Sequence, residues 1–169
     1  GHDGWDTRIT VDAAGRPHMS AIDPLEFGGD GITYYRRNGP GDWTVESIGS
    51  GQQTYKYSTS IAVASDGTAY ITYYDQGGKD LALARRDDSG WTIDHIDTDG
   101  DTGLFSSLVI DADGRFHITY LQKESASKGV VKYATSATGD GEWTIQDIDS
   151  LDRLAFGFLG ARNITSVAI

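Results

Sequence analysis

A hairpin motif that occurs three times constrains the fold of this chain more than any other feature. Each copy has a short apolar run, a tight turn with a glycine, and a second run rich in β-branched and aromatic residues, as paired β-strands do. The copies occupy residues 9–20, 60–75 and 107–120, and residues 166–169 repeat the start of the motif. The turn glycines Gly15, Gly67 and Gly114 lie 52 and 47 residues apart. A period of this size predicts a repeat architecture.

Each repeat unit contains four strand-like runs, of which the hairpin supplies the first two. The third runs cover residues 31–37, 80–86 and 130–135, and the fourth runs cover residues 43–48, 91–96 and 143–148. Every fourth run opens with Trp-Thr followed by Ile or Val, at Trp43, Trp91 and Trp143. A large aromatic residue at the same place in every unit predicts a packing anchor between neighbouring units, with ligand stacking as the alternative.

Four antiparallel strands per unit, with no long helix between units, are typical of the blades of a β-propeller. A sandwich built from the same hairpins would not explain why whole four-strand units recur. We therefore predict an all-β chain, a single propeller segment over residues 1–169, in which three complete blades are followed by the first strand of a fourth. The blades are expected at about residues 5–49, 58–97 and 106–149, and the extra strand at about residues 164–169. The ring would be partial, or completed by an oligomer.

The repeated motif resembles the blades of bacterial repeat propellers in the broad Asp-box and kelch-like group. One turn adds to this resemblance, because residues 88–93, Asp-Ser-Gly-Trp-Thr-Ile, look like a degenerate Asp-box between the third and fourth strands. The corresponding turns of the other two units depart from that pattern. An Asp-box stabilises a turn and does no chemistry, so the resemblance implies a fold and no particular activity.

Composition excludes several classes of partner and site. A formal net charge of -11 argues against nucleic acid as a partner, because binding its phosphates requires clustered Lys and Arg. No apolar run approaches the roughly 20 residues of a membrane-spanning helix. The absence of cysteine excludes disulfides, thiol catalysis and thiolate metal sites. The compartment stays open, with the extracellular or periplasmic space favoured.

The longer connections of a propeller meet on one rim of the disc, called the loop rim below, and the tight turns form the opposite hairpin rim. Loops on a rigid scaffold are where binding residues are expected. Aromatic rings beside carboxylates suit a neutral sugar or a peptide. The predicted ligand-binding residues are Asp23, Tyr55, Tyr57, Asp75 and Phe105. In the alternative interpretation, the rings fill space between blades.

Three carboxylates at alternate positions, Asp97, Asp99 and Asp101, form a candidate calcium site. The alternative is a solvated acidic turn, and no other cofactor is predicted. His18 and His117 occupy equivalent positions of their units, which favours a structural role over metal binding.

No catalytic residue can be named, because no nucleophile motif is present and the 25 Asp and Glu residues single out no acid–base pair. The repeats are regular, whereas catalytic sites usually interrupt one unit. We therefore predict a non-enzymatic module that binds a glycan or a protein, or an architectural scaffold that assembles into a closed ring. The alternative is part of a propeller enzyme acting on polysaccharides, a sialidase-like hydrolase or a lyase.

Closure of the ring requires a partner, because propellers contain about four to eight blades and three blades leave open edges. A homodimer would supply six blades. Residues 164–169 would then be exchanged between subunits, or a second polypeptide would complete the fourth blade.

Overall fold

A computed structural model describes residues 5–23, 31–49, 59–87 and 89–152 of the chain. These residues form twelve strands in three four-stranded antiparallel sheets, which confirms the predicted all-β class. Within the same ranges there is no helix of the length and apolarity that crossing a membrane requires. The predicted strand at residues 164–169 lies outside the described residues, as do Tyr55 and Tyr57.

Each sheet is one blade, and its strands follow one another in chain order. Blade 1 consists of β1 (Trp5–Val11), β2 (Pro17–Asp23), β3 (Gly31–Gly39) and β4 (Asp42–Ile48). Blade 2 consists of β5 (Ser60–Val63), β6 (Ala69–Asp75), β7 (Asp80–Asp87) and β8 (Gly90–Asp97). Blade 3 consists of β9 (Asp101–Ile110), β10 (Phe116–Lys123), β11 (Lys128–Ser136) and β12 (Thr144–Asp152). The strand β9 thus begins earlier than the predicted start of blade 3, because part of the acidic segment is itself a strand.

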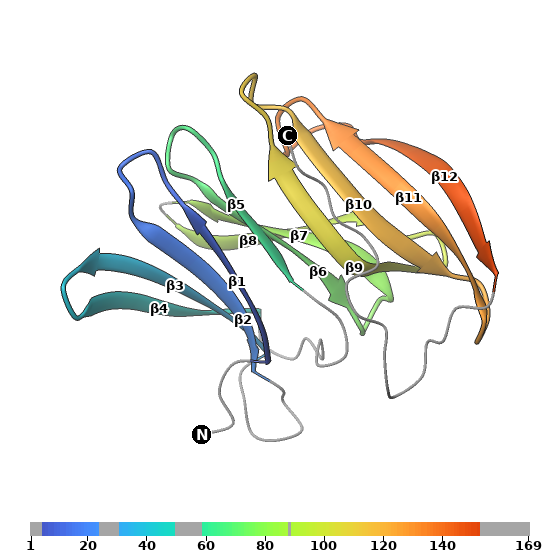
Figure 1. Cartoon of the computed structure of the whole chain (residues 1–169), viewed down its shortest axis with the longest axis horizontal. Coiled ribbons are helices and arrows are strands. Elements are labelled where there is room, and N and C mark those ends of the chain that lie inside the picture. Colours follow the sequence, from blue (N-terminus) through green and yellow to red (C-terminus); the bar gives the residue numbers. More distant parts are fainter. Residues whose placement is uncertain (1–4, 24–30, 50–58, 88, 153–169) are drawn as a thin grey trace.

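The three blades lie one after another, with first strands β1, β5 and β9 as neighbours (Figure 1). The face that a blade turns to the preceding blade is its leading face, and the opposite face is its trailing face. In blade 2, Ile61, Ile71 and Tyr73 belong to the core with blade 1. Ala62 and Leu83, whose side chains lie on the opposite face of the sheet, belong to the core with blade 3. This period of two explains why the blade 2 strands are apolar on both faces.

The tryptophan of blade 2 anchors its leading face on blade 1. The rings of Trp91 and Tyr34 meet edge to face with centroids 5.1 Å apart. The Trp91 Nε1 donates a hydrogen bond to Glu46 Oε2 at 2.9 Å. Arg86 donates to both oxygens of the same carboxylate, at 2.8 and 2.7 Å. The predicted packing role is therefore confirmed for Trp91.

Hydroxyl pairs connect successive blades near their first strands. Ser20 of blade 1 bonds Thr59 before β5, with their oxygens 2.8 Å apart. At the equivalent place, Thr72 of blade 2 bonds Ser106 of blade 3 at 3.1 Å. All four residues are buried, so each pair satisfies hydroxyls that would otherwise be costly to bury.

The two equivalent histidines hold their own blades together. His18 lies between the Tyr34 hydroxyl, 2.7 Å from Nδ1, and Asp12 Oδ2, 3.3 Å from Nε2. His117 lies in the same way between Tyr133 and Asp111, and the latter contact is 3.0 Å. In blade 2 the histidine position is occupied by Tyr70, without this chain of contacts. The equivalence therefore reflects structure, as the sequence indicated.

Burial of His18 makes stability depend on pH. Burial lowers the pKa of His18 from the usual value of about 6.5 and outweighs the opposing effect of Asp12. Below about pH 6.5 the unfolded chain therefore binds a proton that the folded chain does not, so the free energy of unfolding falls as the pH drops towards the lowered pKa. We expect His18→Gln to flatten this dependence below about pH 6.5, as measured by urea denaturation. Equal slopes for the variant and the wild type would contradict it.

Candidate functional site

Backbone strain gathers at the loop rim. Among the described residues, three non-glycine residues have φ in the left-handed region: Asp6 at 48°, Lys79 at 64° and Phe105 at 55°. Asp6 is the second residue of β1 and Lys79 lies in the β6–β7 connection, so these two are at the loop rim, whereas Phe105 lies in the middle of β9. Such conformations persist where the surrounding structure enforces them, and they cluster at binding sites. The loop rim is therefore the candidate functional face.

Asp6 is a loop-rim residue that sequence reasoning missed. Its carboxylate forms an ion pair with Arg8, while Oδ2 is buried with no hydrogen-bond partner among the described residues. Burial raises the pKa of Asp6, with Arg8 opposing this effect. Alignment of the units could have revealed this residue, because Asp6 occupies the position of Ser58 and Phe105 and is the only charged residue of the three.

Three side chains at the loop-rim end of blade 2 form a second, denser cluster. His95 Nδ1 lies 3.0 Å from Asp80 Oδ2 and 4.0 Å from Asp75 Oδ2. One ligand atom from each of the three lies within 4.8 Å of the others, an arrangement that no other trio of His, Asp or Glu has in the described part of the chain. Asp75 was among the ligand-binding residues predicted from the sequence, whereas Asp80 and His95 were not.

The β6–β7 connection positions this cluster. Asp75 is buried, and its Oδ1 accepts a hydrogen bond from the Gly77 N–H at 2.9 Å. The Lys79 N–H closes the turn on the Asp75 carbonyl at 2.7 Å. A Cβ atom on Gly78 would lie 2.3 Å from Asp80 Oδ2, so a side chain there would displace the Asp80 carboxylate from its position beside Asp75. The cluster can bind hydroxyl groups or, through two carboxylates and an imidazole, a divalent cation.

The other predicted ligand residues lie apart from this cluster. Phe105 is buried and packs with Tyr74, Leu104 and Leu121, which favours the interpretation that its ring fills space between blades. Asp23 ends β2 at the loop rim of blade 1.

The acidic segment between blades 2 and 3 is largely occupied by protein partners. Asp97 is buried, and its Oδ2 accepts hydrogen bonds from Tyr120 at 2.7 Å and Lys132 Nζ at 2.9 Å. Burial raises the pKa of Asp97, but these two bonds together with the Asp99 N–H more than offset it, so the pKa lies below its usual range. Asp101 accepts from Tyr74 at 2.8 Å. Calcium at Asp97, Asp99 and Asp101 stays a prediction, and the cation would compete with Lys132.

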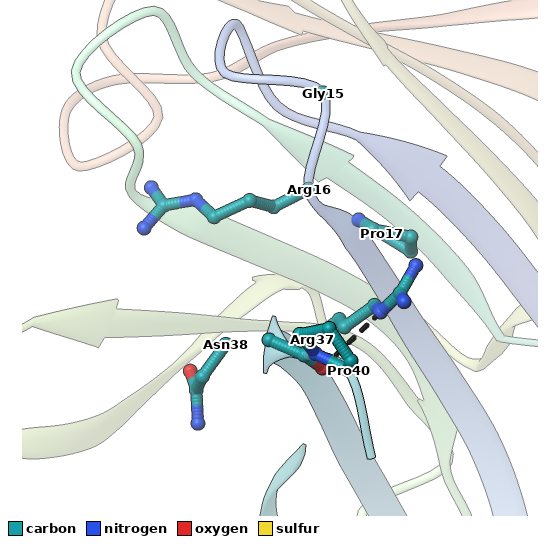
Figure 2. A pocket seen from close by; sticks show the side chains of 7 residues that line it. Gly15, Arg16, Pro17, Arg37, Asn38 and Pro40 are labelled. Atoms are coloured by element: carbon teal, nitrogen blue, oxygen red, sulfur yellow. Dashed lines mark hydrogen bonds between the residues drawn. The ribbon is translucent and has the colours of Figure 1, made fainter. Parts of the chain in front are cut away.

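A shallow pocket lies on the opposite, hairpin rim of blade 1. It measures about 190 Å³ and is lined by Gly15, Arg16, Pro17, Arg37, Asn38, Gly39 and Pro40. Figure 2 shows it between the β1–β2 and β3–β4 turns, where Arg37 Nε donates to the Gly39 carbonyl at 3.3 Å. Ligand pockets usually measure about 300–1,000 Å³, so this one is too small to be the main binding site.

Comparison with solved structures shows a likeness in fold. No family model matches the sequence, and no curated protein matches it. A fucose lectin from Kordia zhangzhouensis superposes with a TM-score of 0.55 and 12% identity, over 83% of this chain and 96% of the lectin. An exo-β-1,3-galactanase from Phanerochaete chrysosporium superposes with a TM-score of 0.55 and 14% identity, over 84% of this chain and 35% of the galactanase. A GH43 α-L-arabinofuranosidase from Clostridium thermocellum superposes with a TM-score of 0.54 and 12% identity, over 86% of this chain and 51% of the enzyme.

The chain thus spans about a third of the galactanase and half of the arabinofuranosidase. Identities this low relate folds and do not transfer an activity. Membership of the Asp-box and kelch-like group stays a prediction. The three stacked four-stranded blades and these similar structures show that the chain has the β-propeller fold.

Proposed function

We propose that the chain is a non-enzymatic glycan-binding module whose ligand binds at the loop rim of blade 2. The observation that carries this proposal is the cluster of Asp75, Asp80 and His95. Sugar hydroxyls can donate to the carboxylates and to an unprotonated imidazole nitrogen, so neighbouring hydroxyls of one sugar match this set of groups. Hydrogen bonds to carboxylates are among the stronger ones.

The cluster is held in place before any ligand arrives. The Gly77 N–H fixes Asp75, and the short contact with Asp80 fixes the imidazole of His95. Asp75 is buried while His95 is exposed, so a ligand would meet His95 and Asp80 first. Prior ordering of binding groups lowers the entropy cost of binding.

The likeness to a sugar-binding protein also supports this proposal. The fucose lectin is matched over 96% of its own length, at 12% identity, so a chain with this arrangement of blades can bind a sugar without a further domain of its own.

A polysaccharide-cleaving enzyme is the second candidate, and two carboxylates at the loop rim favour it. One oxygen of Asp75 and one of Asp80 lie within 4.8 Å of each other, and retaining glycosidases use carboxyl groups about 5–5.5 Å apart. Because Asp75 is buried and both residues belong to one blade, we place this candidate second.

Replacing Asp80 with Asn is expected to weaken sugar binding roughly 10- to 100-fold, the effect of losing a hydrogen bond to a charged group. A glycan array would first identify the ligand, and isothermal titration would then compare the wild type with Asp80→Asn and His95→Ala. Asp113→Asn on the hairpin rim is the matched control and should bind normally. Unchanged affinity in both cluster variants would contradict the site, and product release that disappears in Asp80→Asn would identify an enzyme.

Three further expectations are part of this proposal. The protein acts in the extracellular or periplasmic space, a protein can replace the glycan as ligand, and calcium binds the acidic segment that contains Asp99. None of them is needed for the sugar-binding experiment.

A further inference from the structure

We propose that the leading face of blade 1 binds the trailing face of blade 3 of a second copy, so that two copies close a six-bladed ring. This inference does not depend on the proposed sugar site. It rests on the two interfaces between blades within the chain, which show what each face binds.

The leading face of blade 1 is an interface without its partner. Its apolar side chains are exposed: Ile9 by 66%, Val11 by 60%, Val45 by 59% and Trp43 by 40%. The equivalent side chains of blade 2, which pack on blade 1, are Ile61, Val63, Ile93 and Trp91. The same residue types at the same positions indicate that the leading face of blade 1 also fits a trailing face.

The trailing face of blade 3 repeats the one that receives Trp91. On blade 1 that surface consists of His18, Tyr34, Glu46 and Ile48, and blade 3 carries His117, Tyr133, Gln146 and Ile148 at the equivalent positions. Blade 2 differs, with Tyr70 and Leu83 in place of the first two. Ile48 is fully buried beneath blade 2, whereas Ile148 is 57% exposed.

Two buried hydroxyls on this trailing face lack partners. Thr119 Oγ1 and Thr135 Oγ1 are enclosed and have no hydrogen-bond partner among the described residues. Thr119 occupies the position of Ser20 and Thr72, whose hydroxyls bond the first strand of the next blade. In a second copy, Thr7 occupies the position of those bonding partners, and it is exposed. Thr165 of the chain itself, which lies outside the described residues, occupies this position too, so Thr119 fits a first strand on this face, and the deletion of residues 164–169 below distinguishes the two donors of that strand.

The contacts expected in this interface follow from those between blades 1 and 2. Trp43 would pack edge to face on Tyr133 of the second copy, as Trp91 packs on Tyr34. Its Nε1 would donate to Gln146, which replaces Glu46. Arg37 occupies the position of Arg86 and would reach the same side-chain oxygen. An amide oxygen accepts both bonds but carries no charge, so this interface is weaker than its counterpart within the chain.

The arrangement closes on itself. Each copy contributes one leading and one trailing face, so two copies form two identical interfaces and a ring of six blades, within the range of about four to eight in propellers. A dimer in which two leading faces meet would leave Thr119 and Tyr133 uncovered.

The first test is the mass of the chain and of two surface variants by analytical ultracentrifugation. We expect the wild type at twice 18.2 kDa, with Trp43→Glu and Ile148→Glu at the monomer mass. Ala13→Glu, on the hairpin rim, adds the same charge outside both faces and should remain a dimer. Circular dichroism and urea denaturation would verify that the variants fold. A monomeric wild type, or folded variants that remain dimers, would overturn the proposal.

Mixing the two monomeric variants tests the head-to-tail geometry. Trp43→Glu retains an intact trailing face and Ile148→Glu an intact leading face, so the mixture should form a heterodimer through one native interface. Gln146→Glu, which recreates the carboxylate of Glu46, should tighten the wild-type dimer at least about threefold, because hydrogen bonds to a charged acceptor are stronger, whereas Gln146→Lys should weaken it. If the mixture forms no heterodimer, or if the dimer affinity is the same in both Gln146 variants as in the wild type, the proposal is overturned. The same holds if deleting residues 164–169 abolishes the dimer and Trp43→Glu does not.

Discussion

Replacing Asp97 with Ala is expected to lower the free energy of unfolding by about 3–5 kcal/mol, the usual cost of removing one partner of a buried ion pair. Asp97 and Lys132 are both buried between blades 2 and 3, with Lys132 Nζ 2.9 Å from Asp97 Oδ2. Without the carboxylate, the ammonium group of Lys132 would be left buried without its main counter-charge, and Tyr120 would lose its acceptor. Urea denaturation measures the change.

Two further variants separate the charge from the packing. Asp97→Ala combined with Lys132→Met should recover much of the lost stability, because an apolar side chain of similar length is often as stable as a buried ion pair. Asp99→Ala, on an exposed neighbour, should change stability by no more than about 0.5 kcal/mol. A loss below about 1 kcal/mol for Asp97→Ala would mean that water reaches the pair.

The fold could be predicted because it is repeated locally. Each hairpin has its own pair of strand-like runs and its own turn glycine, and Trp-Thr begins the fourth strand of every unit. Because these signals recur in three approximate copies, each copy supports the prediction made from the others. The histidine contacts were also accessible, since Asp, His and Tyr recur at the same spacing as Asp12, His18 and Tyr34 and as Asp111, His117 and Tyr133. The equal spacing of these residues in two units is the signal that predicts the contacts.

The candidate site depends on register, which the sequence does not reveal. His95 reaches Asp80 because the β7–β8 pairing shifts between Leu81 and Ala82, so that Ala82 opposes His95. The Asp97–Lys132 pair joins two blades, and Lys132 occupies the position that Ala82 has in blade 2, with no local pattern to indicate a partner. Contacts of this kind follow from tertiary packing and not from periodicity.

Replacing Trp91 with Ala is expected to lower the free energy of unfolding by about 2–4 kcal/mol, at or just below the usual cost of deleting a buried aromatic ring because Trp91 is only half-buried. The variant loses the contact with Tyr34 and the hydrogen bond to Glu46. Trp91→Phe would keep a ring but lose the donor, and should cost about 1 kcal/mol of hydrogen-bond energy in addition to some packing.

Trp43 is the matched control for this prediction, because it occupies the same position of blade 1 but is 40% exposed. Both alanine variants should be made in the Ile148→Glu background, in which the proposed ring cannot close, so that association does not contribute to the measured stability. In that monomer, Trp43→Ala should cost no more than about 1 kcal/mol, since little of its environment changes.

Equal losses at the two positions would contradict the assignment of Trp91 as an anchor between blades. A small loss at both would revive ligand stacking as the role of the repeated tryptophan. A large loss at Trp91 alone would mean that a leading face stabilises the fold only where a blade precedes it, and this is the reason to expect the exposed face around Trp43 to take a second copy.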